Sequence, residues 1–423
     1  MEPGIKNWAI NSIENQNAIV MKSTIHLIIG IGIFSGLSII EIQAVGYRLP
    51  NQDPEGIARG NAFAATADNP SAIYYNPAGI TQLDGQQISV GAYFISTNVD
   101  FKSPTGEQAS TVTDFQAVPQ IYYTFSPEAS PFSFGFGIYA PYGLGIEYED
   151  KTQTPFSTLA EEGKVLYACF NPVIGYQISP SLSVAAGLTI NYSEADLKRG
   201  IGLSPGDQFR FDGDGFAYGL NFGVLWQPLP EWSLGLNCRS STEVDYKGDS
   251  IADPYSDSQS TSASLTFPCF LVGGISYRPN DRWNFEFNLD WTDWDSVNDT
   301  RFKGTFGGDK PFRFRYESGF MYNFGITRKL NGGYYVSAGY IYSENNVPNE
   351  TFSPLNPDSN LHLGSVGFGH RGDKYSWALG YHFAYNGGRE VSGNQAVSPA
   401  GQTADGEYET FNHAVNLSIR YAF

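Results

Sequence analysis

The sequence predicts an all-β protein, a transmembrane antiparallel β-barrel of about fourteen strands with a small N-terminal hatch, or plug, inside its lumen. Three observations predict this fold. Long stretches of the chain alternate apolar residues, many of them aromatic, with polar ones. Short turns and long polar connections follow one another in strict alternation, and a segment rich in Ala, Gly and Asn precedes the first strand. Such a segment has the composition of a compact plug and not of a wall.

The alternation is clearest after Arg282, where a wholly apolar face alternates with a wholly polar one. The last strand repeats the pattern and ends on Phe423, which resembles the C-terminal signal of bacterial outer-membrane barrels. Residues 312–324 give a third such strand. The apolar faces are Trp283, Phe285, Phe287, Leu289 and Trp291; then Phe411, His413, Val415, Leu417, Ile419, Tyr421 and Phe423; then Phe312, Phe314, Tyr316, Phe320, Tyr322 and Phe324. Alternation of this kind predicts strands with one side against lipid.

The connections predict the topology. Turns of a few residues, built from Pro, Asn, Gly, Asp or Ser, alternate with long polar connections, as in a meander with short periplasmic turns and long external loops. The short turns are 126–131, 178–181, 228–231, 278–282, 329–333 and 371–374. The long connections are 102–113, 147–163, 200–207, 248–260, 297–310, 345–360 and 387–409.

Composition narrows the class of protein. Among the 423 residues, aromatic residues make up 15% and charged residues only 16%, which suits a wall that faces lipid. The formal net charge of −18 argues against nucleic-acid binding, which needs clustered Lys and Arg. The three cysteines form no CxxC pair, and their odd number argues against a disulfide framework. No P-loop, GxSxG or zinc motif is present, so no cofactor, metal or enzyme activity is expected.

The N-terminus predicts export. Residues 21–44 read as a signal peptide, with a charged start at Met21-Lys22, an apolar core and the small residue Ala44 before the cleavage site. Residues 1–20 read as an extension from a start site annotated too early. A membrane anchor is the alternative for the apolar run, but Ala44 favours cleavage. No other segment is apolar enough for a membrane helix, so a membrane location requires a barrel. The domains are then a hatch at 45–85 and a barrel at 86–423.

Two stretches break the strand pattern. In the third strand, Phe132, Phe134, Phe136 and Ile138 point outward and are followed by Pro141, Tyr142, Gly143, Leu144 and Gly145. Because proline lacks a ladder donor and glycine lacks a wall side chain, strand pairing is expected to fail here and leave a gap. An ordinary bulge is the alternative. In the hatch, NPAG comprises Asn76, Pro77, Ala78 and Gly79: Asn76 caps a turn, Pro77 fixes it, and Gly79 lets the backbone approach the wall closely. A plain turn is the alternative there.

A family resemblance rests on these and other stretches. NPAG, preceded by ARGNAFAATADNPSAIYY, resembles the hatch of the FadL-type long-chain fatty acid and hydrocarbon transporters (OMPP1/FadL/TodX). Three later stretches agree in order and spacing: APYGLG at 140–145, SYRPNDRWNFEFNLDWTDW at 276–294, and residues 346–371. The resemblance covers residues 45–423. It implies a fourteen-strand barrel plugged by its hatch, with an inward kink in the third strand that Tyr142-Gly143-Leu144 matches.

The resemblance also implies roles for particular residues. Asn76, Pro77, Ala78 and Gly79 would brace the hatch against the kinked strand. Arg199 matches the arginine that lies near the fatty-acid head group. A second basic partner would come from Lys310, Arg313 or Arg315, although none of them aligns cleanly with it. Each of these cations has the alternative of a solvated charge in the lumen or at its rim.

The resulting hypothesis is passive uptake of long-chain fatty acids or similar hydrophobic molecules across an outer membrane. Lateral release through the gap into the bilayer would keep the hydrocarbon out of water, at about 0.8 kcal/mol per methylene. The expected partners are the hydrophobic cargo and outer-membrane lipid, and the barrel is expected to be a monomer. Three alternatives stay open: an aromatic or alkane hydrocarbon channel, a surface barrel for adhesion or phage attachment, and an outer-membrane lipid hydrolase.

Overall fold

Strands that alternate between apolar and polar side chains build almost the whole of the described chain. The computed structural model describes residues 47–113, 115–149, 153–297, 299–306, 308–396, 398 and 400–423, without the side chains of Leu144, Lys310 and Pro311. Within these residues, fourteen antiparallel wall strands form one closed barrel, which confirms the predicted fold class and strand number. The predicted extension (1–20) and signal peptide (21–44) lie outside the described residues.

Three wall strands are interrupted along their length, and each of these is a pair of consecutive labelled strands. The wall is formed by β1 Gly85–Lys102, β3 Gln116–Ser126, β4 Phe132–Tyr139 with β5 Gly143–Glu147, β6 Glu162–Ser179, β7 Leu182–Gly200, β8 Gln208–Leu229, β9 Trp232–Arg239 with β10 Thr242–Asp253, β11 Gln259–Phe267 with β12 Phe270–Asn280, β13 Trp283–Thr292, β16 Gly319–Lys329, β17 Tyr334–Ser343, β18 Leu361–Arg371, β19 Tyr375–Tyr385 and β21 Gly406–Ala422. The barrel closes between its first and last strands, from Gln87↔Ala422 to Lys102↔Glu407.

The remaining elements are short and lie in the connections or before the wall. Strands β2 Gln108–Ser110, β14 Thr300–Phe302, β15 Lys310–Phe312 and β20 Arg389–Val391 lie in connections, as do the 3-10 helices η2 Trp294–Ser296, η3 Asn331–Gly333 and η4 Asn349–Thr351. Before β1 come α2 Pro54–Ile57, α3 Ala72–Tyr75 and η1 Pro77–Gln82. None of the helices in the described part of the chain is long and apolar enough to cross a membrane.

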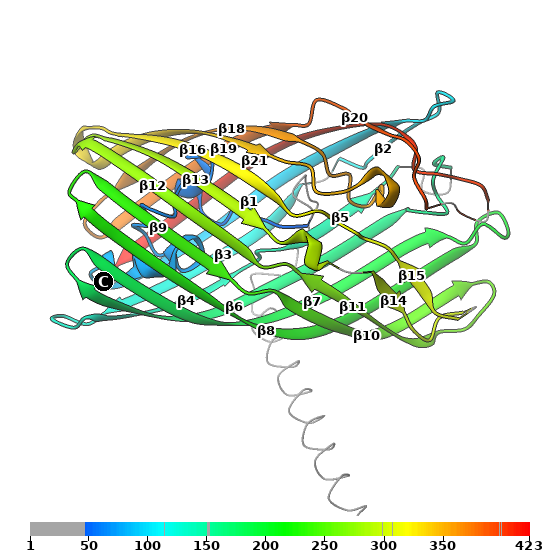
Figure 1. Cartoon of the computed structure of the whole chain (residues 1–423), viewed down its shortest axis with the longest axis horizontal. Coiled ribbons are helices and arrows are strands. Elements are labelled where there is room, and N and C mark those ends of the chain that lie inside the picture. Colours follow the sequence, from blue (N-terminus) through cyan, green and yellow to red (C-terminus); the bar gives the residue numbers. More distant parts are fainter. Residues whose placement is uncertain are drawn as a thin grey trace, which may run out of the picture. The chain divides into compact units, whose positions relative to one another are not determined.

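The two ends of the barrel differ in their connections. Short turns and the C-terminus lie at one end, here called the short-turn end, and the long connections lie at the other, the long-loop end (Figure 1). The outer surface between them carries large apolar side chains at alternate positions. On β4, for example, Phe132, Phe134 and Phe136 are 43%, 44% and 40% exposed, while Ser133 between the first two is buried. An exposed aromatic surface of this kind is stable only against lipid.

One predicted strand is wrong over part of its length. Residues 313–318 are not in a strand; β15 ends at Phe312 and the wall resumes at Gly319. Tyr316, expected on the lipid-facing side, is only 5% exposed and belongs to the core within the barrel. The apolar face of this stretch points toward the lumen. Alternation did not reveal this, because a lumen lined with apolar side chains accepts aromatic residues as readily as lipid does.

The segment before the first strand lies within the barrel. Residues 47–83, here called the N-terminal segment, are drawn in blue inside the wall near the short-turn end (Figure 1). Of residues 47–80, every one except Asp68 is buried. Its hydrogen bonds reach wall strands around the circumference: Asn237 on β9 donates to Tyr74 O (3.0 Å), Asn288 on β13 donates to Asn61 O (3.1 Å), and Gly60 N donates to Ser365 on β18 (3.1 Å).

Glycines in the wall allow this close fit. A Cβ atom placed on Gly235 of β9 would lie 2.0 Å from Ala64 O, and one on Gly339 of β17 would lie 2.0 Å from Gly60 N. Backbone atoms cannot move aside as a flexible side chain can, so any larger residue at either position conflicts with the N-terminal segment in its present place.

Candidate functional site

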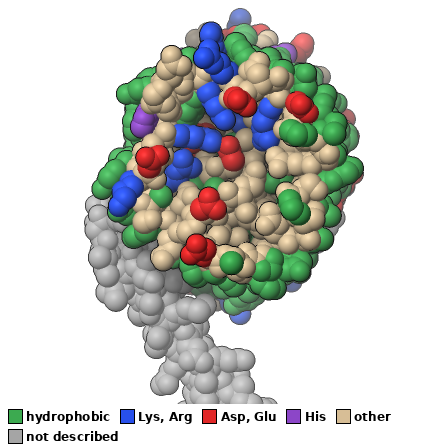
Figure 2. Space-filling model, turned by 90° about the vertical axis from the view of Figure 1, so that its left-hand side faces the viewer, with side chains coloured by type: hydrophobic (Ala, Val, Ile, Leu, Met, Phe, Trp, Pro, Cys, Tyr) green, Lys and Arg blue, Asp and Glu red, His purple; other side chains and the backbone are tan. Residues whose placement is uncertain are grey.

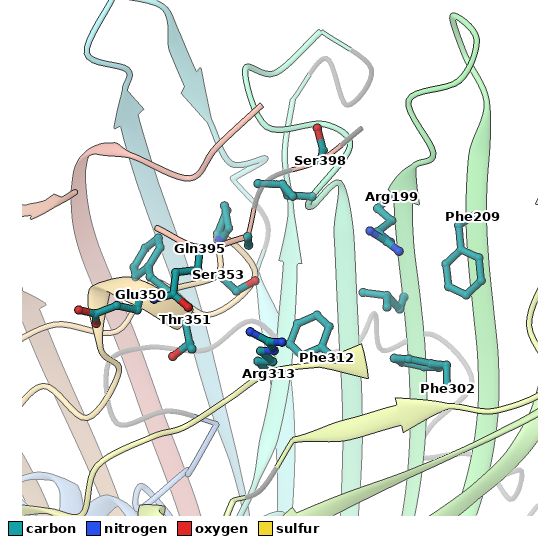
Figure 3. Close-up of a pocket in the computed structure, with 15 residues that line it drawn as sticks. Arg199, Phe209, Phe302, Phe312, Arg313, Glu350, Thr351, Ser353, Gln395 and Ser398 are labelled. Atoms are coloured by element: carbon teal, nitrogen blue, oxygen red, sulfur yellow. The ribbon is translucent and has the colours of Figure 1, made fainter. Parts of the chain in front are cut away.

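A cavity of about 410 Å³ lies inside the long-loop end of the barrel and is here called the outer cavity. It is lined by Leu159, Leu197, Arg199, Phe209, Phe302, Phe312, Arg313, Glu350, Thr351, Phe352, Ser353, Pro354, Gln395, Ala396 and Ser398. The lining comes from wall strands β7 and β8 and from long connections that turn inward (Figure 3). A mostly apolar cavity with a few charged groups has the composition of a site for an amphipathic ligand.

Two predicted cations meet in this cavity, although 114 positions separate them in the sequence. Arg199 is the last residue but one of β7, and Arg313 follows β15. Figure 3 shows both side chains among Phe209, Phe302 and Phe312. Arg199 lies over the Phe209 ring, 5.6 Å from its centroid, and donates to Thr158 O at 3.5 Å. Within the described part of the chain, neither arginine forms an ion pair with a carboxylate. Glu350 lines the same cavity, so the two arginines leave it one net positive charge, which suits an anionic ligand.

Of the other two predicted basic residues, Arg315 does not line the outer cavity, and the side chain of Lys310 is outside the described part of the chain. Arg315 is exposed, has a positive φ of 45°, and does not line the outer cavity. The backbone of Lys310 begins β15, but its side chain lies outside the described part of the chain. Of the three candidates for a second basic partner, the structure thus brings only Arg313 together with Arg199.

The loop that follows Arg199 is held by one carboxylate. Asp207 accepts from the backbone N–H groups of Ile201, Gly202, Leu203 and Ser204 at 2.7–3.0 Å. Burial pushes the pKa of Asp207 upward, but these four hydrogen bonds outweigh it and hold the pKa at about 2. The carboxylate is therefore ionised at neutral pH and fixes the loop that follows Arg199.

A second cavity, of about 110 Å³, lies deeper and is here called the inner cavity. It shares Leu197, Phe302, Phe312 and Ser353 with the outer cavity, so the two are neighbours. Most of its other lining is aromatic or aliphatic: Tyr47, Val165, Ala195, Phe211, Tyr246, Ala263, Leu265, Phe314, Tyr316 and Leu355. The pair of cavities thus leads from the cationic outer site to an apolar inner one.

An aromatic cluster closes the inner cavity on the side of the N-terminal segment. Tyr47 lines the cavity and contacts three further rings, with centroids 5.0 Å from Trp294, 5.4 Å from Phe267 and 6.2 Å from Tyr142. Tyr142 in turn packs on Tyr167. We call Tyr47, Tyr142, Tyr167, Phe267 and Trp294 the aromatic cluster. It connects the inner cavity to the interrupted third wall strand, in which Tyr142 lies.

The third wall strand is interrupted between β4 and β5. Strand β3 pairs with β4 only from Ile121↔Ile138 to Phe125↔Phe134. Its residues 116–120 pair with β1 on one side and, within the described part of the chain, with no strand on the other. Pro141 and Tyr142 lie in the interruption, while Gly143, Leu144 and Gly145 begin β5, which pairs with β6.

The N-terminal segment pairs with the third wall strand at the place where β3 does not. Leu49 N donates to Pro141 O at 2.8 Å, and Gly143 N donates to Tyr47 O at 3.0 Å. Residues 47–49 therefore form a short antiparallel bridge with residues 141–143 in place of the missing ladder. The backbone of the N-terminal segment and the backbone at the interruption are bonded directly, so a shift of one displaces the other.

The NPAG residues are braced differently from the expectation. Asn76 donates to Ala64 O (2.7 Å) and to Val224 O of β8 (2.9 Å), so its wall contact is with β8 and not with the interrupted strand. Pro77 and Ala78 begin η1. A Cβ on Gly79 would lie 2.2 Å from Ala67 O, so the close approach of Gly79 is within the segment and not to the wall. Ile73 and Ile80 pack against β4 beside Gly135, and the Tyr74 ring packs against Tyr139 of the same strand.

The polar face of β13 is a functional feature that sequence reasoning missed. Glu286 accepts from Ala65 N (2.8 Å) and pairs with Arg59 (3.2 Å), and Asp290 pairs with Arg48 at 2.7 and 2.9 Å. The alternation in this strand predicted a polar face but not what it contacts. Four inward polar residues in one strand are the signal that could have pointed to an internal partner.

Arg239 is a second feature that the sequence did not reveal. At the end of β9 it is 4% exposed, donates to Tyr139 OH (2.5 Å) and lies beside the rings of Tyr74 and Phe270. It has no carboxylate partner in the described part of the chain. Tyr139 is the last residue of β4, so this cation holds the wall at the start of the interruption.

A closed barrel with a lipid-facing aromatic surface, an internal segment and a mostly apolar internal cavity defines a membrane-embedded transport protein. The chain matches the family described as outer membrane protein transport protein (OMPP1/FadL/TodX) over residues 38–423. The chain belongs to this family. The membership places the protein in the outer membrane, and it confirms the prediction of a transporter and not an enzyme.

Individual relatives cover nearly the whole chain. It is 22% identical to the long-chain fatty acid transport protein of Escherichia coli O6:H1, over 92% of this chain and 97% of that one. Two solved structures have a similar fold. A Pseudomonas aeruginosa FadL homologue has a TM-score of 0.79 at 18% identity, covering 89% of this chain and 99% of its own. The Pseudomonas putida toluene transporter TodX has a TM-score of 0.70 at 16% identity, covering 91% and 100%.

Proposed function

We propose that this protein takes up long-chain fatty acids, or similar hydrophobic molecules with an anionic head group, passively across the outer membrane. The observation that carries the proposal is a cavity lined mainly by apolar residues, in which Arg199 and Arg313 outnumber the one carboxylate, Glu350, and form no ion pair with any described residue. A carboxylate head group matches the two guanidinium groups, and an alkyl chain matches the apolar lining and the inner cavity beyond it. The long-chain fatty acid transport protein of E. coli, a relative over nearly its full length, supports this substrate class.

The described lining of both cavities comes from one chain, and the protein is proposed to act as a monomer. Residues 21–44 are proposed to serve as its cleaved export signal and residues 47–83 as its plug. Long connections contribute residues 350–354, 395, 396 and 398 to the outer cavity, which favours uptake over adhesion or phage attachment as the role of the long-loop end.

An aromatic hydrocarbon channel is the second candidate function. The ring-lined inner cavity favours it, because a small aromatic molecule needs no cation and fits a compact aromatic enclosure. The two candidates differ in their dependence on charge. Fatty acid binding requires Arg199 and Arg313, and hydrocarbon binding does not.

Replacing Arg199 by alanine is expected to weaken oleate binding and uptake about ten- to a hundredfold while leaving toluene binding unchanged, because a charge-assisted hydrogen bond is worth about 1.5–3 kcal/mol. The measurement is equilibrium binding of oleate and of toluene to the purified barrel. Arg210→Ala is the matched control, since Arg210 lies nearby on β8 but does not line the outer cavity. Unchanged oleate binding in both Arg199→Ala and Arg313→Ala would exclude head-group recognition in this cavity.

Release is proposed to occur sideways, at the interruption between β4 and β5. The aromatic cluster leads from the inner cavity to Tyr142, and residues 116–120 of β3 have no wall partner on that side in the described part of the chain. Cargo that leaves there enters lipid and keeps its alkyl chain out of water, whereas axial release into the periplasm exposes each methylene at a cost of about 0.8 kcal/mol. The N-terminal segment bonded to residues 141–143 would control this path.

A fluorescent long-chain fatty acid added outside proteoliposomes is expected to reach a bilayer-embedded quencher at the same rate with or without albumin trapped inside. Lateral release delivers cargo to the bilayer, so no aqueous acceptor is needed. Liposomes without the protein give the background rate. Transfer that requires the trapped albumin would show axial release and contradict the proposed route.

A further inference from the structure

A third cavity, of about 250 Å³, lies at the short-turn end between the N-terminal segment and the wall, and is here called the basic pocket. It is remote from the outer cavity and shares no lining residue with it. Its lining consists of Glu55, Arg59, Thr66, Asp68, Arg282, Asn284, Thr327, Lys329, Leu330, Gly333, Tyr334, Tyr335, Ser337 and Arg371. Lysine and arginine side chains gather on this face of a protein whose net charge is strongly negative (Figure 2).

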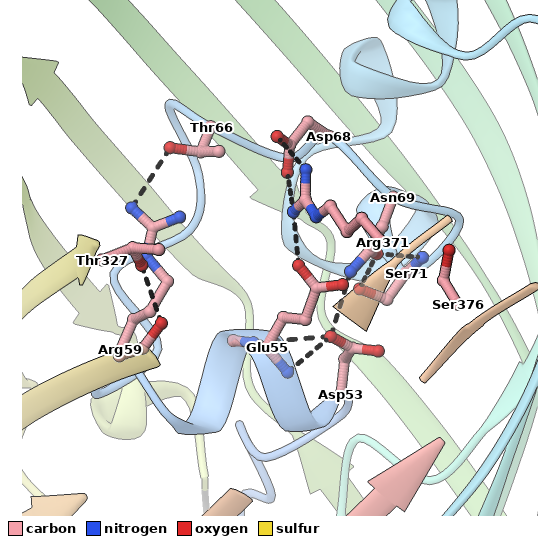
Figure 4. Close-up of polar contacts among 12 residues, drawn as sticks. Asp53, Glu55, Arg59, Thr66, Asp68, Asn69, Ser71, Thr327, Arg371 and Ser376 are labelled. Atoms are coloured by element: carbon pink, nitrogen blue, oxygen red, sulfur yellow. Dashed lines mark hydrogen bonds and ion pairs between the residues drawn. The ribbon is translucent and has the colours of Figure 1, made fainter. Parts of the chain in front are cut away.

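The four cations that line the basic pocket outnumber the carboxylates, even when Glu286 is counted with Glu55 and Asp68. Arg371 holds Asp68 with two hydrogen bonds of 2.7 and 2.9 Å and also pairs with Glu55, as Figure 4 shows. Arg59 pairs with Glu286, which does not itself line the pocket. This leaves Arg282 and Lys329, which are exposed and form no ion pair in the described part of the chain. The pocket therefore carries positive charge that the protein itself does not compensate.

Further polar groups line the pocket beside these two cations. Arg59 reaches the pocket from the N-terminal segment, and its Nη2 atom also donates to Thr66 and Glu286. The hydroxyls of Thr327 and Ser337 add further hydrogen-bonding groups to the lining, although they already pair with each other.

We propose that the basic pocket binds a phosphate group, held by Arg282 and Lys329 from the wall turns and by Arg59 from within. Phosphate suits this donor set, because its oxygens accept several charge-assisted hydrogen bonds at once. Arg59 belongs to the N-terminal segment, while Arg282 and Lys329 belong to the wall. The bound group bridges the two and stabilises the segment in its place inside the barrel.

The test is titration of the purified full-length protein with inorganic phosphate, followed by calorimetry, against sodium chloride of equal ionic strength. Saturable binding is expected, about tenfold weaker in Lys329→Gln and in Arg282→Gln and unchanged in Lys374→Gln, a control on the neighbouring exposed turn. Tyr335→Phe, which removes a hydroxyl that lies against Gly369 and not in the pocket, is expected to leave binding unchanged. Phosphate is also expected to slow amide hydrogen exchange in residues 55–68.

A second arm identifies the source of the phosphate group. Nanodiscs containing phosphatidylglycerol are compared with nanodiscs of phosphatidylcholine, using the same exchange measurement. Protection that depends on Lys329 and appears with free phosphate assigns a soluble ligand, and protection only with phosphatidylglycerol assigns a lipid head group. No protection in either arm, binding equal to that of chloride, or binding unaffected by both Lys329→Gln and Arg282→Gln overturns the proposal.

Discussion

Asp290→Ala is expected to detach residues 47–49 from the interrupted wall strand while the barrel stays closed. Asp290 accepts two hydrogen bonds from the Arg48 guanidinium, at 2.7 and 2.9 Å, and both side chains are almost completely buried. Thr292 and the Phe270 ring, 3.8 Å from the guanidinium carbon, cannot replace the lost charge. A buried cation left without its partner costs about 3–5 kcal/mol, the largest single effect expected in this protein.

The effect is local because Arg48 lies between Tyr47 and Leu49, whose backbones bond to residues 141–143. Loss of the ion pair is therefore expected to speed amide hydrogen exchange at Leu49 and Gly143 well beyond that in β21, whose ladder is unaffected. Cells carrying the variant are expected to become more sensitive to small polar antibiotics, since the N-terminal segment no longer holds its place in the lumen. Both measurements report on the segment and not on the wall.

Asp212→Ala is the matched control, because Asp212 is an exposed wall residue in β8 whose truncation is expected to change stability by about 0.5 kcal/mol or less. Asp290→Asn keeps the shape and one acceptor oxygen, so an intermediate effect is expected. Exchange at Leu49 and Gly143 that stays as slow in Asp290→Ala as in Asp212→Ala would show that the ion pair does not hold the segment.

The wall strands were predictable because every second residue of such a strand faces lipid and is therefore apolar. Phe285 and Leu289 of β13 and Val415 and Leu417 of β21 all point outward, as their alternation predicted. The number of wall strands followed from the alternation of short and long connections, which is also a local property of the sequence. Neither prediction required knowledge of which distant residues meet.

The same rule failed where apolar side chains line a lumen. Phe312, Phe314 and Tyr316 alternate with polar residues as lipid-facing residues do, yet they line the cavities. Periodicity reports that one face is apolar and not which apolar surroundings it meets. The wall-strand prediction for residues 313–318 was wrong for this reason.

The internal contacts depend on partners far apart in the chain. Glu286 meets Arg59 across 227 positions, and Arg48 meets Asp290 across 242. Nothing local in either stretch specifies such a pairing, because an inward carboxylate could equally face water or a cation of another loop. The same holds for Arg199 and Arg313, whose shared cavity forms only when the long connections fold inward.

Gly235→Ala is expected to destabilise the N-terminal segment far more than the addition of one methyl group elsewhere in the wall. The new Cβ would lie 2.0 Å from Ala64 O and 2.4 Å from Ala64 C, and both are backbone atoms. Relief requires the segment to move away from β9, which strains the hydrogen bond from Ser233 to Ala65 O (2.6 Å). Overpacking of this kind costs about 1–3 kcal/mol and sometimes more. The measurement is the free energy of unfolding in denaturant, with amide exchange at residues 63–66.

Gly273→Ala provides the control, because the two glycines lie on neighbouring wall strands and differ only in what their Cβ atoms would meet. Gly273 belongs to β12, where a Cβ has no atom within 4 Å. A general cost of alanine in the wall would appear equally in both variants, whereas a conflict with the N-terminal segment appears only in Gly235→Ala. A double variant with Asp290→Ala separates the two further: once the segment is detached, the Gly235 substitution should cost much less than it does alone. Full additivity of the two costs would mean that the glycine and the ion pair do not act on the same segment.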